Sequence, residues 1–359
     1  MDVLGDSYDI TARCAGGANA GHTVVVNGKK FAFHLLPSSI LHPKNTCLIG
    51  NGVVLHIPSF FKELKNLENQ GIDYQGRILI SDRAHVLFDF HQAIDGAAED
   101  AAALTGQKIG TTRRGIGPAY ASKVNRIGVR VGDLQFPKVF REKLERMSAY
   151  WKRSYPLEIN VDKIAEEYLG YWNTIRPTVV DSVLFLNEAL GKGRRVMVEG
   201  ANATMLDLDF GTYPYVTSSS CSIGGACTGL GIPPSRIGAV VGVVKAYATR
   251  VGEGPFTTEL LDATGETLRK VGGEFGVTTG RPRRCGWLDL VQLRYAHAIN
   301  GFTCINITKL DVLTGLPEIK VLCCFCPFPF SFGRRCVWAT STTASACPPF
   351  PPRWRSSRT

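Results

Sequence analysis

The feature that most constrains the fold is the alternation of apolar runs and amphipathic helical segments between about residues 135 and 320. Apolar side chains recur at helical spacing from Pro137 to Tyr155 and from Val179 to Leu190, where Gly191 ends the pattern. The runs 195–198 and 237–244 are apolar and β-branched, which predicts buried strands. Because strands that alternate with helices build parallel sheets, we expect an α/β fold, a single large domain with a mostly parallel central sheet flanked by helices.

The end of this alternating region carries a possible base-binding signal. A helical stripe of Leu288, Val291, Tyr295 and Ile299 is closed by Gly301, and the apolar run 302–307 then predicts a strand. The tetrapeptide 308–311 follows this strand and reads Thr-Lys-Leu-Asp. An aspartate at a strand end can accept both the ring N–H and the exocyclic amine of guanine. The same tetrapeptide also suits an exposed charged turn.

Charge and cysteine usage limit the classes of partner. Of the formal net charge of +10, half comes from the five arginines of residues 321–359, a segment without acidic residues. The remaining excess is spread over a long body and suits small anionic ligands better than nucleic acid, so we expect no nucleic-acid binding. The 11 cysteines form no metal-type pairs through most of the chain, and no charged-then-apolar leader precedes them. We therefore expect a cytoplasmic protein without disulfides.

Composition changes at Val321, after which the chain is rich in cysteine, proline and arginine. This segment has neither helix nor strand periodicity, and its prolines oppose both structures. Its apolar part is far shorter than the ~20 residues that a membrane span requires, so we expect no membrane insertion. The expected organisation is a domain over residues 1–320 and a disordered tail over residues 321–359.

Glycine-rich polar loops supply the candidate binding residues. Residues 16–23 offer free backbone amides to an anion, with His22 as a proton donor, although a plain turn has the same composition. Residues 110–118 combine hydroxyls and guanidinium groups, which suits phosphate oxygens and equally suits an exposed basic loop. Residues 199–202 follow a strand, where ligands of open α/β sheets bind, and residues 213–219 are a polar continuation. Residues 278–284 place three arginines beside two threonines, a set that fits a dicarboxylate and a phosphate.

Taken in order, segments 19–23, 110–120, 211–219, 278–289 and 308–311 resemble the adenylosuccinate synthetase family over roughly residues 9–320. The resemblance implies a ligase that forms a C–N bond between IMP and L-aspartate at the expense of GTP, the first committed step from IMP to AMP. In that family the γ-phosphate of GTP moves to O6 of IMP, and the amine of aspartate then displaces it. Such a transfer depends mainly on charge placement and in-line positioning.

The resemblance also implies roles for individual residues. His22 would be the catalytic acid, and the carbonyl of Gly21 would reach Mg²⁺. The residues that would bind IMP are Asn19, Ala20, Gly21, His22, Thr112, Asn202, Thr217, Arg281 and, from the other subunit of a homodimer, Arg126. Those that would bind aspartate are Val277, Thr278, Thr279, Gly280, Arg281 and Arg283. Those that would bind GTP are Gly21, His22, Thr23, Arg283, Lys309, Leu310 and Asp311.

Two family features have no counterpart in the printed sequence. One is an opening strand with a Gly-Asp-Glu-Gly-Lys-Gly-Lys phosphate loop that carries the catalytic base, and the other is a Ser/Thr-Gly-Pro segment of the guanine pocket. We therefore expect a domain that is incomplete at both ends and turnover well below that of an intact enzyme. The alternative is a catalytically dead form that acts as a non-catalytic dimer partner or an IMP-binding module. A GTP-binding switch protein is a third hypothesis, disfavoured because no Gly-x-x-x-x-Gly-Lys-Ser/Thr run is present.

Overall fold

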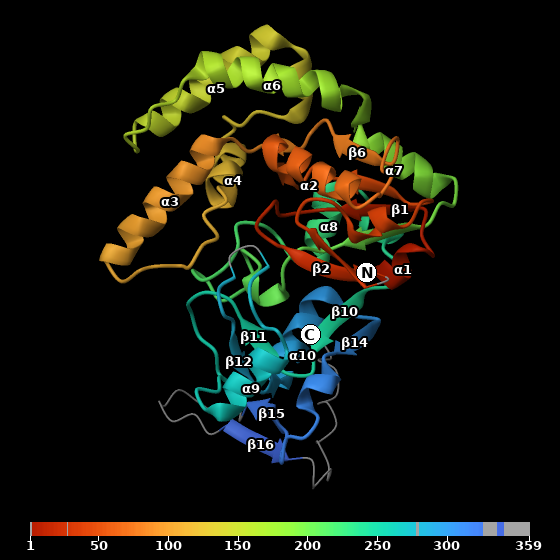
Figure 1. Ribbon diagram of the computed structural model, residues 1–359, viewed down its shortest axis with the longest axis vertical. Coiled ribbons are helices and arrows are strands. Elements are labelled where there is room, and N and C mark those ends of the chain that lie inside the picture. Colours follow the sequence, from red (N-terminus) through yellow and green to blue (C-terminus); the bar gives the residue numbers. More distant parts are fainter. Residues whose placement is uncertain (1, 27, 278–279, 326–335, 341–359) are drawn as a thin grey trace, which may run out of the picture.

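A parallel five-stranded sheet forms the centre of the molecule (Figure 1). The computed structural model describes residues 2–26, 28–277, 280–325 and 336–340. The sheet has the order β8-β6-β4-β1-β9, and each neighbouring pair runs parallel. Its strands are β1 (Ile10–Arg13), β4 (Thr46–Ile49), β6 (Ile78–Ser81), β8 (Val179–Val180) and β9 (Val196–Glu199). The expected α/β fold with a mostly parallel central sheet is confirmed.

Helices cover both faces of this sheet. One buried apolar cluster joins the sheet to α2 (Ile57–Asn69), α3 (Asp89–Leu104), α5 (Pro137–Lys152) and α6 (Val161–Ile175). A second cluster joins it to α7 (Ser182–Gly191) and α8 (Ile223–Leu230). Cys47 and Ile49 belong to the first cluster and Leu48 to the second, because successive side chains of a strand face opposite sides. Figure 1 shows α5 and α6 as an outer layer beyond α2.

A second group of elements lies beside the central sheet, in the lower half of Figure 1. Strand β10 (Val241–Lys245) pairs in parallel with β14 (Cys304–Thr308), and β11 (Ala248–Arg250) pairs with β12 (Arg284–Gly286) in antiparallel. Helices α9 (Ala263–Val271) and α10 (Leu290–Asn300) pack here, with β13 (Leu288–Asp289), β15 (Lys320–Phe325) and β16 (Cys336–Thr340). The remaining elements are α1 (Asp2–Gly5), α4 (Ile116–Val124), β2 (His22–Val26), β3 (Lys29–Phe33), β5 (Val54–Leu55) and β7 (His85–Val86).

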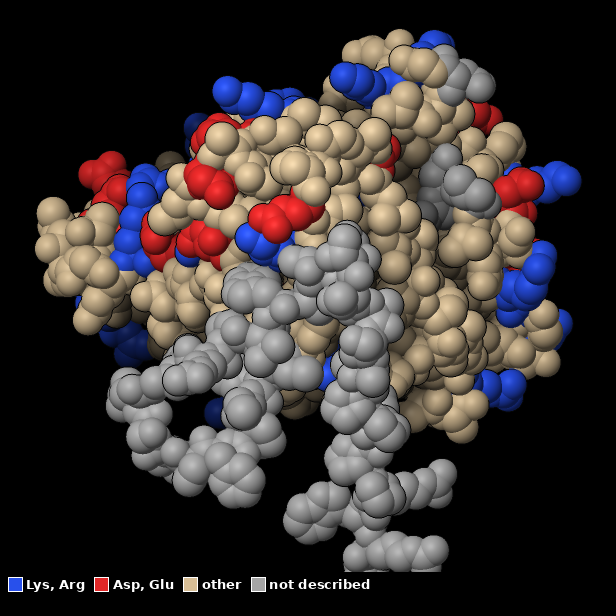
Figure 2. Space-filling view, turned by 90° about the horizontal axis from the view of Figure 1, so that it is seen from below, with Lys and Arg blue, Asp and Glu red and all other residues tan. Residues whose placement is uncertain are grey.

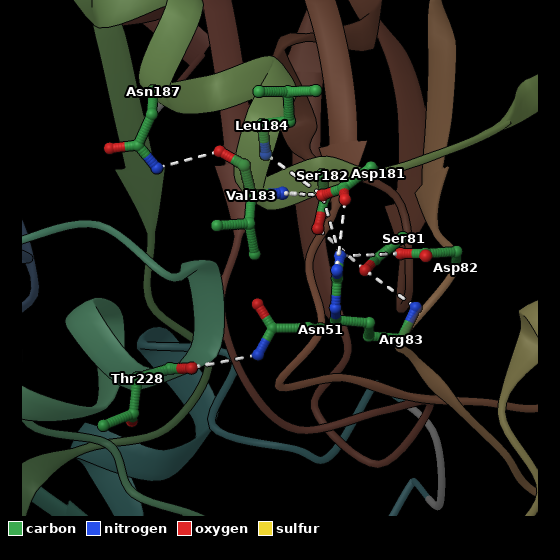
Figure 3. A network of polar contacts seen from close by, with 10 residues as sticks. All are labelled: Asn51, Ser81, Asp82, Arg83, Asp181, Ser182, Val183, Leu184, Asn187 and Thr228. Carbon is green, nitrogen blue, oxygen red and sulfur yellow. Dashed lines mark hydrogen bonds and ion pairs between the residues drawn. The ribbon is translucent and has the colours of Figure 1, made fainter.

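The helix expected from Val179 begins later, at Ser182. Val179 and Val180 instead form β8 and extend the central sheet beside β6. Asp181 then caps α7, since its carboxylate accepts hydrogen bonds from the N–H groups of Val183 and Leu184 at 3.1 and 3.0 Å. Arg83 holds the same carboxylate through Nη1 and Nη2 at 2.7 and 3.1 Å, as Figure 3 shows. A capping carboxylate and sheet pairing therefore override the helical periodicity at this end.

The other two expected helices are confirmed with small shifts at their ends. Helix α5 ends at Lys152 rather than Tyr155, and its stripe of Phe140, Leu144, Met147 and Trp151 is buried as expected. In α10, Gly301 adopts φ 61° and closes the helix. Leu288 lies outside α10, in β13.

Two expectations about strands are wrong. The apolar run at 237–244 was expected to be buried, yet in β10 the side chains of Val241 and Val243 are 44% and 63% exposed. Among the described strands β10 pairs only with β14, so one of its edges remains open toward a cavity. The segment after Val321 was expected to lack strands, yet β15 and β16 pair in antiparallel and Leu322 is fully buried. The prolines that argued against pairing lie at 327 and 329, between these strands, and from 348 onward, and most of the tail lies outside the described residues.

The described surface mixes charges of both signs. In Figure 2, Lys and Arg side chains are scattered over the visible face with Asp and Glu between them. None of the helices in the described ranges combines the length and apolar character that crossing a bilayer demands. The seven cysteines described with their side chains are free thiols.

Candidate functional site

Two adjoining cavities lie between the central sheet and the second group of elements. The larger has a volume of about 940 Å³ and the smaller about 800 Å³. Gly21, Asn202 and Lys245 line both of them. The smaller cavity is also lined by β9 and β10, so strand edges from both parts of the molecule face it. Polar loops that follow the strands therefore converge at one place.

The larger cavity collects many of the residues expected from the sequence. Its wall includes residues from all the glycine-rich loops singled out above: Asn19, Ala20, Gly21, Thr112, Asn202, Thr217, Val277, Arg281 and Arg283. The smaller cavity is lined by Ala20, Gly21, His22 and Asn202. These residues span more than 250 positions of the chain, and the fold alone brings them together.

Hydrogen bonds between backbone N–H groups and side chains hold the loop that begins at Gly16. Gly16 has φ 79° and donates its N–H to the hydroxyl of Tyr120 at 2.9 Å. The side-chain oxygen of Asn19 accepts the N–H of Gly17 at 3.2 Å, while its amide donates to Thr217 Oγ1 at 3.5 Å. Contacts within the chain therefore hold the loop, and Asn19 and Thr217, both of which line the larger cavity, are joined by a hydrogen bond.

His22 begins β2 and lies beside a buried carboxylate. Its Nε2 is 3.5 Å from Oε1 of Glu199, without hydrogen-bond geometry, and it has no hydrogen-bond partner among the described residues. Burial lowers the pKa of His22, and the negative charge of Glu199 opposes this shift. Glu199 is itself fixed by the N–H and hydroxyl of Ser38 at 3.0 and 2.7 Å. An imidazole with a free nitrogen at a cavity wall can exchange a proton with a ligand.

Buried carboxylates of α3 hold the loop that contains Thr112. Glu99 accepts the N–H of Gly110 at 2.6 Å, and Asp95 accepts the N–H of Gly115 at 2.9 Å. Gly115 has φ 72°, and a Cβ there would lie 2.7 Å from backbone atoms of α3. This close approach explains the glycine, and it places Thr112 and Thr111 on the wall of the larger cavity.

Arg281 and Arg283 reach the larger cavity from the segment before β12. Arg281 donates to the carbonyl of Gly110 at 2.8 Å, so it joins two of the loops. Arg283 donates to Oε2 of the buried Glu274 at 2.7 Å. Thr278 and Thr279, which belong to the same predicted aspartate site, lie outside the described residues.

The predicted guanine selector lies next to this wall but lines neither cavity. Lys309 has φ 62° and donates to the carbonyl of Gly272 at 2.8 Å. Asp311 is exposed at the start of a short 3-10 helix, Leu310–Leu313. Neither cavity is lined by Thr23, Arg126, Gly280 or Leu310, and Arg126 is exposed just after α4.

The described residues provide no ready-made metal cage. They contain no group of three His, Cys, Asp or Glu side chains placed to hold a metal ion. Gly21, whose carbonyl was predicted to bind Mg²⁺, lies at the junction of the two cavities. Because Mg²⁺ keeps several waters and takes phosphate oxygens, a single protein carbonyl at such a position fits it as one ligand.

Sequence reasoning missed several charged residues at the site. Lys245 lines both cavities, Arg250 lines the larger one, and Glu274 is buried behind them. Lys245 is the last residue of β10. Because ligands of open α/β sheets bind at the carboxyl ends of strands, a charged residue at that position of an apolar run could have been identified from the sequence. Nothing in the local sequence marks Glu274, because its partners lie on distant segments.

Comparison with known proteins places this arrangement in one family. The family model described as adenylosuccinate synthetase matches residues 1–326, slightly more than the expected 9–320. The chain is 56% identical over 326 residues to adenylosuccinate synthetase 1, chloroplastic, of Physcomitrium patens, covering 89% of this chain and 63% of that protein. It is 54% identical over 324 residues to adenylosuccinate synthetase of Dictyostelium discoideum, covering 89% of this chain and 76% of that protein. The chain thus spans somewhat under two thirds of the length of the moss relative.

A solved structure agrees with the fold. The fully ligated adenylosuccinate synthetase from Plasmodium falciparum superposes with a TM-score of 0.84 at 46% identity, over 89% of this chain and 75% of that one. A succinoaminodeoxyadenylate synthetase of cyanophage S-2L, at 22% identity and a TM-score of 0.61, shares the fold. With four of the five resembling segments at one pair of cavities and a family match over most of its length, this chain belongs to the adenylosuccinate synthetase family.

Proposed function

We propose that the two cavities form the site for GTP-dependent ligation of IMP and L-aspartate to adenylosuccinate. The observation that carries the proposal is the convergence of Asn19, Thr112, Asn202, Thr217 and Arg281 on one cavity of about 940 Å³. Their donors and acceptors suit a purine monophosphate, whose base and phosphate both need hydrogen bonds.

Asn202 supports this assignment most directly. Its side-chain oxygen is buried and has no hydrogen-bond partner among the described residues, although it lines both cavities. A buried acceptor without a hydrogen-bond partner destabilises the folded protein unless a ligand donates a hydrogen bond to it. We propose that IMP supplies the missing donor.

Each remaining substrate has a proposed place. Residues Val277 to Arg283 clasp aspartate, and Arg283 also reaches GTP. Lys309 and Asp311 select guanine, with Leu310 between them, and Gly21 to Thr23 contact the phosphates. His22 acts as the acid in phosphoryl transfer. The carbonyl of Gly21 contributes one ligand to Mg²⁺, which supplies charge neutralisation for the transferred phosphoryl group when it is bound.

The assembly and location belong to the same proposal. A homodimer in which Arg126 of one subunit completes the IMP site of the other agrees with the exposure of Arg126, which lines neither cavity of its own chain. Sedimentation equilibrium tests the dimer, since a purely monomeric species would exclude it. We also propose a cytoplasmic location, although some relatives carry the word chloroplastic in their names. Imaging of a fluorescent fusion distinguishes the two compartments.

The activity is tested by incubating the purified chain with IMP, GTP, L-aspartate and Mg²⁺ and measuring adenylosuccinate by chromatography. Product that requires all three substrates supports the ligase. IMP binding without product would instead support the non-catalytic alternative. Absence of both binding and product would overturn the proposal.

Variants connect the result to the site. Asn202→Ala should weaken IMP binding roughly tenfold, because one buried hydrogen bond to the ligand is lost. Asn187→Ala is the matched control, since Asn187 lines neither cavity and its amide donates to Val183 O (Figure 3) and to Gly231 O. Equal IMP affinity in both variants would remove Asn202 from the site.

A further inference from the structure

A buried carboxylate organises two cations at the cavity wall. Glu274 follows α9 and is only 1% exposed. Its Oε2 lies 2.7 Å from Lys245 Nζ and 2.7 Å from Arg283 Nη1, and its Oε1 accepts the hydroxyl of Tyr247 at 2.6 Å. Lys245 and Tyr247 belong to one segment that runs from β10 into the loop before β11, and Arg283 precedes β12, so one side chain joins two segments of the chain.

The charges in this cluster do not cancel. Two cations face one carboxylate, which leaves an excess of one positive charge. Lys245 and Arg283 are 28% and 23% exposed, and both line the larger cavity. The excess charge is therefore presented to the cavity and not enclosed in the core.

The hydrogen-bond donors of Lys245 also indicate a site for an anion. The ammonium of Lys245 has three N–H donors, of which Glu274 and Thr249 Oγ1 take two, at 2.7 and 3.0 Å. Burial lowers the pKa of Lys245, and hydrogen bonding to Glu274 opposes this shift and favours the charged form. Within the described part of the chain one donor of this charged group has no acceptor, and such a donor at a cavity wall suits an anion.

A purely structural ion pair is the competing explanation. Buried ion pairs contribute little net stability, because desolvation offsets their attraction. That explanation accounts for the Glu274 contacts, but it does not account for two cations that share one carboxylate and both face the cavity. A ligand anion would balance the excess charge.

We propose that Lys245 is a further anion-binding residue of this site, and that Glu274 is a positioning residue that directs Lys245 and Arg283 toward carboxylate or phosphate oxygens of a substrate. This inference rests on the proposed function, because it takes the ligands to be those of the ligase. It adds a residue to which neither the family match nor the sequence motifs gave a role.

The test compares Lys245→Met, Lys245→Arg and Glu274→Gln with the unaltered chain. Isothermal titration calorimetry measures the dissociation constants of IMP, GTP and L-aspartate separately, and urea denaturation measures the free energy of unfolding. Lys245→Met should weaken binding of one ligand roughly 10- to 100-fold, the range for a hydrogen bond between charged groups. Lys245→Arg should restore part of that loss. Weakened aspartate binding identifies a carboxylate, and weakened nucleotide binding identifies a phosphate.

Glu274→Gln should weaken the same ligand as Lys245→Met, because its neutral amide cannot hold both cations. The matched control is Glu266→Gln, which removes an exposed carboxylate of α9 that pairs with Arg269. This control should bind all three ligands like the unaltered chain. If Glu274→Gln fails to fold, the two Lys245 variants carry the test alone.

The outcomes separate this inference from the proposed function. If Lys245→Met binds every ligand like the unaltered chain while Arg281→Ala loses binding, the ligase assignment stands and the inference falls. If the unaltered chain binds none of the three ligands, both fall. Equal loss of all three ligands together with a lower free energy of unfolding would show that the cluster is only structural.

Discussion

Gly229 offers a sharp test of how the site loop is supported. It lies within α8 where that helix crosses the end of β1, and a Cβ there would lie 2.0 Å from the carbonyl oxygen of Cys14. Gly52 approaches the same oxygen equally closely, since a Cβ there would lie 1.9 Å from it. Gly52 N also donates to Gly229 O at 2.9 Å. Three backbone segments therefore meet without room for a methyl group.

The magnitude follows from two opposing effects. Replacing a helical glycine with alanine gains up to about 1 kcal/mol through backbone entropy. Overpacking costs ~1–3 kcal/mol where side chains can adjust. At Gly229 the obstructing atom is a backbone oxygen. The separation must grow from 2.0 Å to the 3.4 Å of an ordinary contact, a shift of about 1.4 Å, so the cost of overpacking lies at the upper end of that range. The difference predicts that Gly229→Ala lowers the free energy of unfolding by about 2 kcal/mol.

Urea denaturation followed by circular dichroism measures this change. The matched control is Gly224→Ala in the same helix, where the nearest atom to the new Cβ, Ser222 Oγ, is 3.6 Å away. The control should be as stable as the unaltered chain or more stable, by up to ~1 kcal/mol. Since the loop 16–23 begins just after Cys14, Gly229→Ala should also weaken IMP binding. A Gly229→Ala variant as stable as the Gly224→Ala variant would refute the reasoning.

Three further predictions concern other parts of the molecule. Asp181→Ala should lower the free energy of unfolding by about 1–2 kcal/mol, because α7 loses its N-cap and Arg83 loses one of its two carboxylate partners, and thermal melting should show a lower midpoint. Burial lowers the pKa of His91 to about 3, so the unfolded chain, with a histidine pKa near ~6.5, takes up a proton first as the pH falls. The free energy of unfolding, measured by urea titration, should therefore decrease from about pH 6.5 toward pH 3. This decrease should be less steep in His91→Gln, and an equally steep decrease in the variant and the unaltered chain would contradict the prediction. Glu199→Gln should lower the pKa of His22 further, since burial already lowers it and Glu199 opposes that shift; an unchanged or higher pKa in an NMR titration of the ring would argue against the contact.

Local periodicity was enough to predict the fold class and several helix ends. The stripe of Phe140, Leu144, Met147 and Trp151 predicted α5 because helical spacing places those side chains on one face. Gly301 predicted the end of α10 because glycine adopts positive φ without strain. The glycine-rich loops predicted ligand contact through composition alone, and many of their residues line the two cavities.

Long-range pairing decided what periodicity could not. Val179 and Val180 fit a helix pattern but gain hydrogen bonds from β6. Val241 and Val243 of β10 remain exposed, and only β14 pairs with that strand among the described residues.

Sequence alone determined that this is a parallel α/β protein with glycine-rich polar loops, because spacing and glycine content are local properties of the chain. Only the tertiary structure decided that the loops share one site and that Glu274 joins Lys245 to Arg283. The physical reason is that a buried charge is tolerable only beside partners, and those partners lie on segments whose meeting depends on the packing of the whole chain.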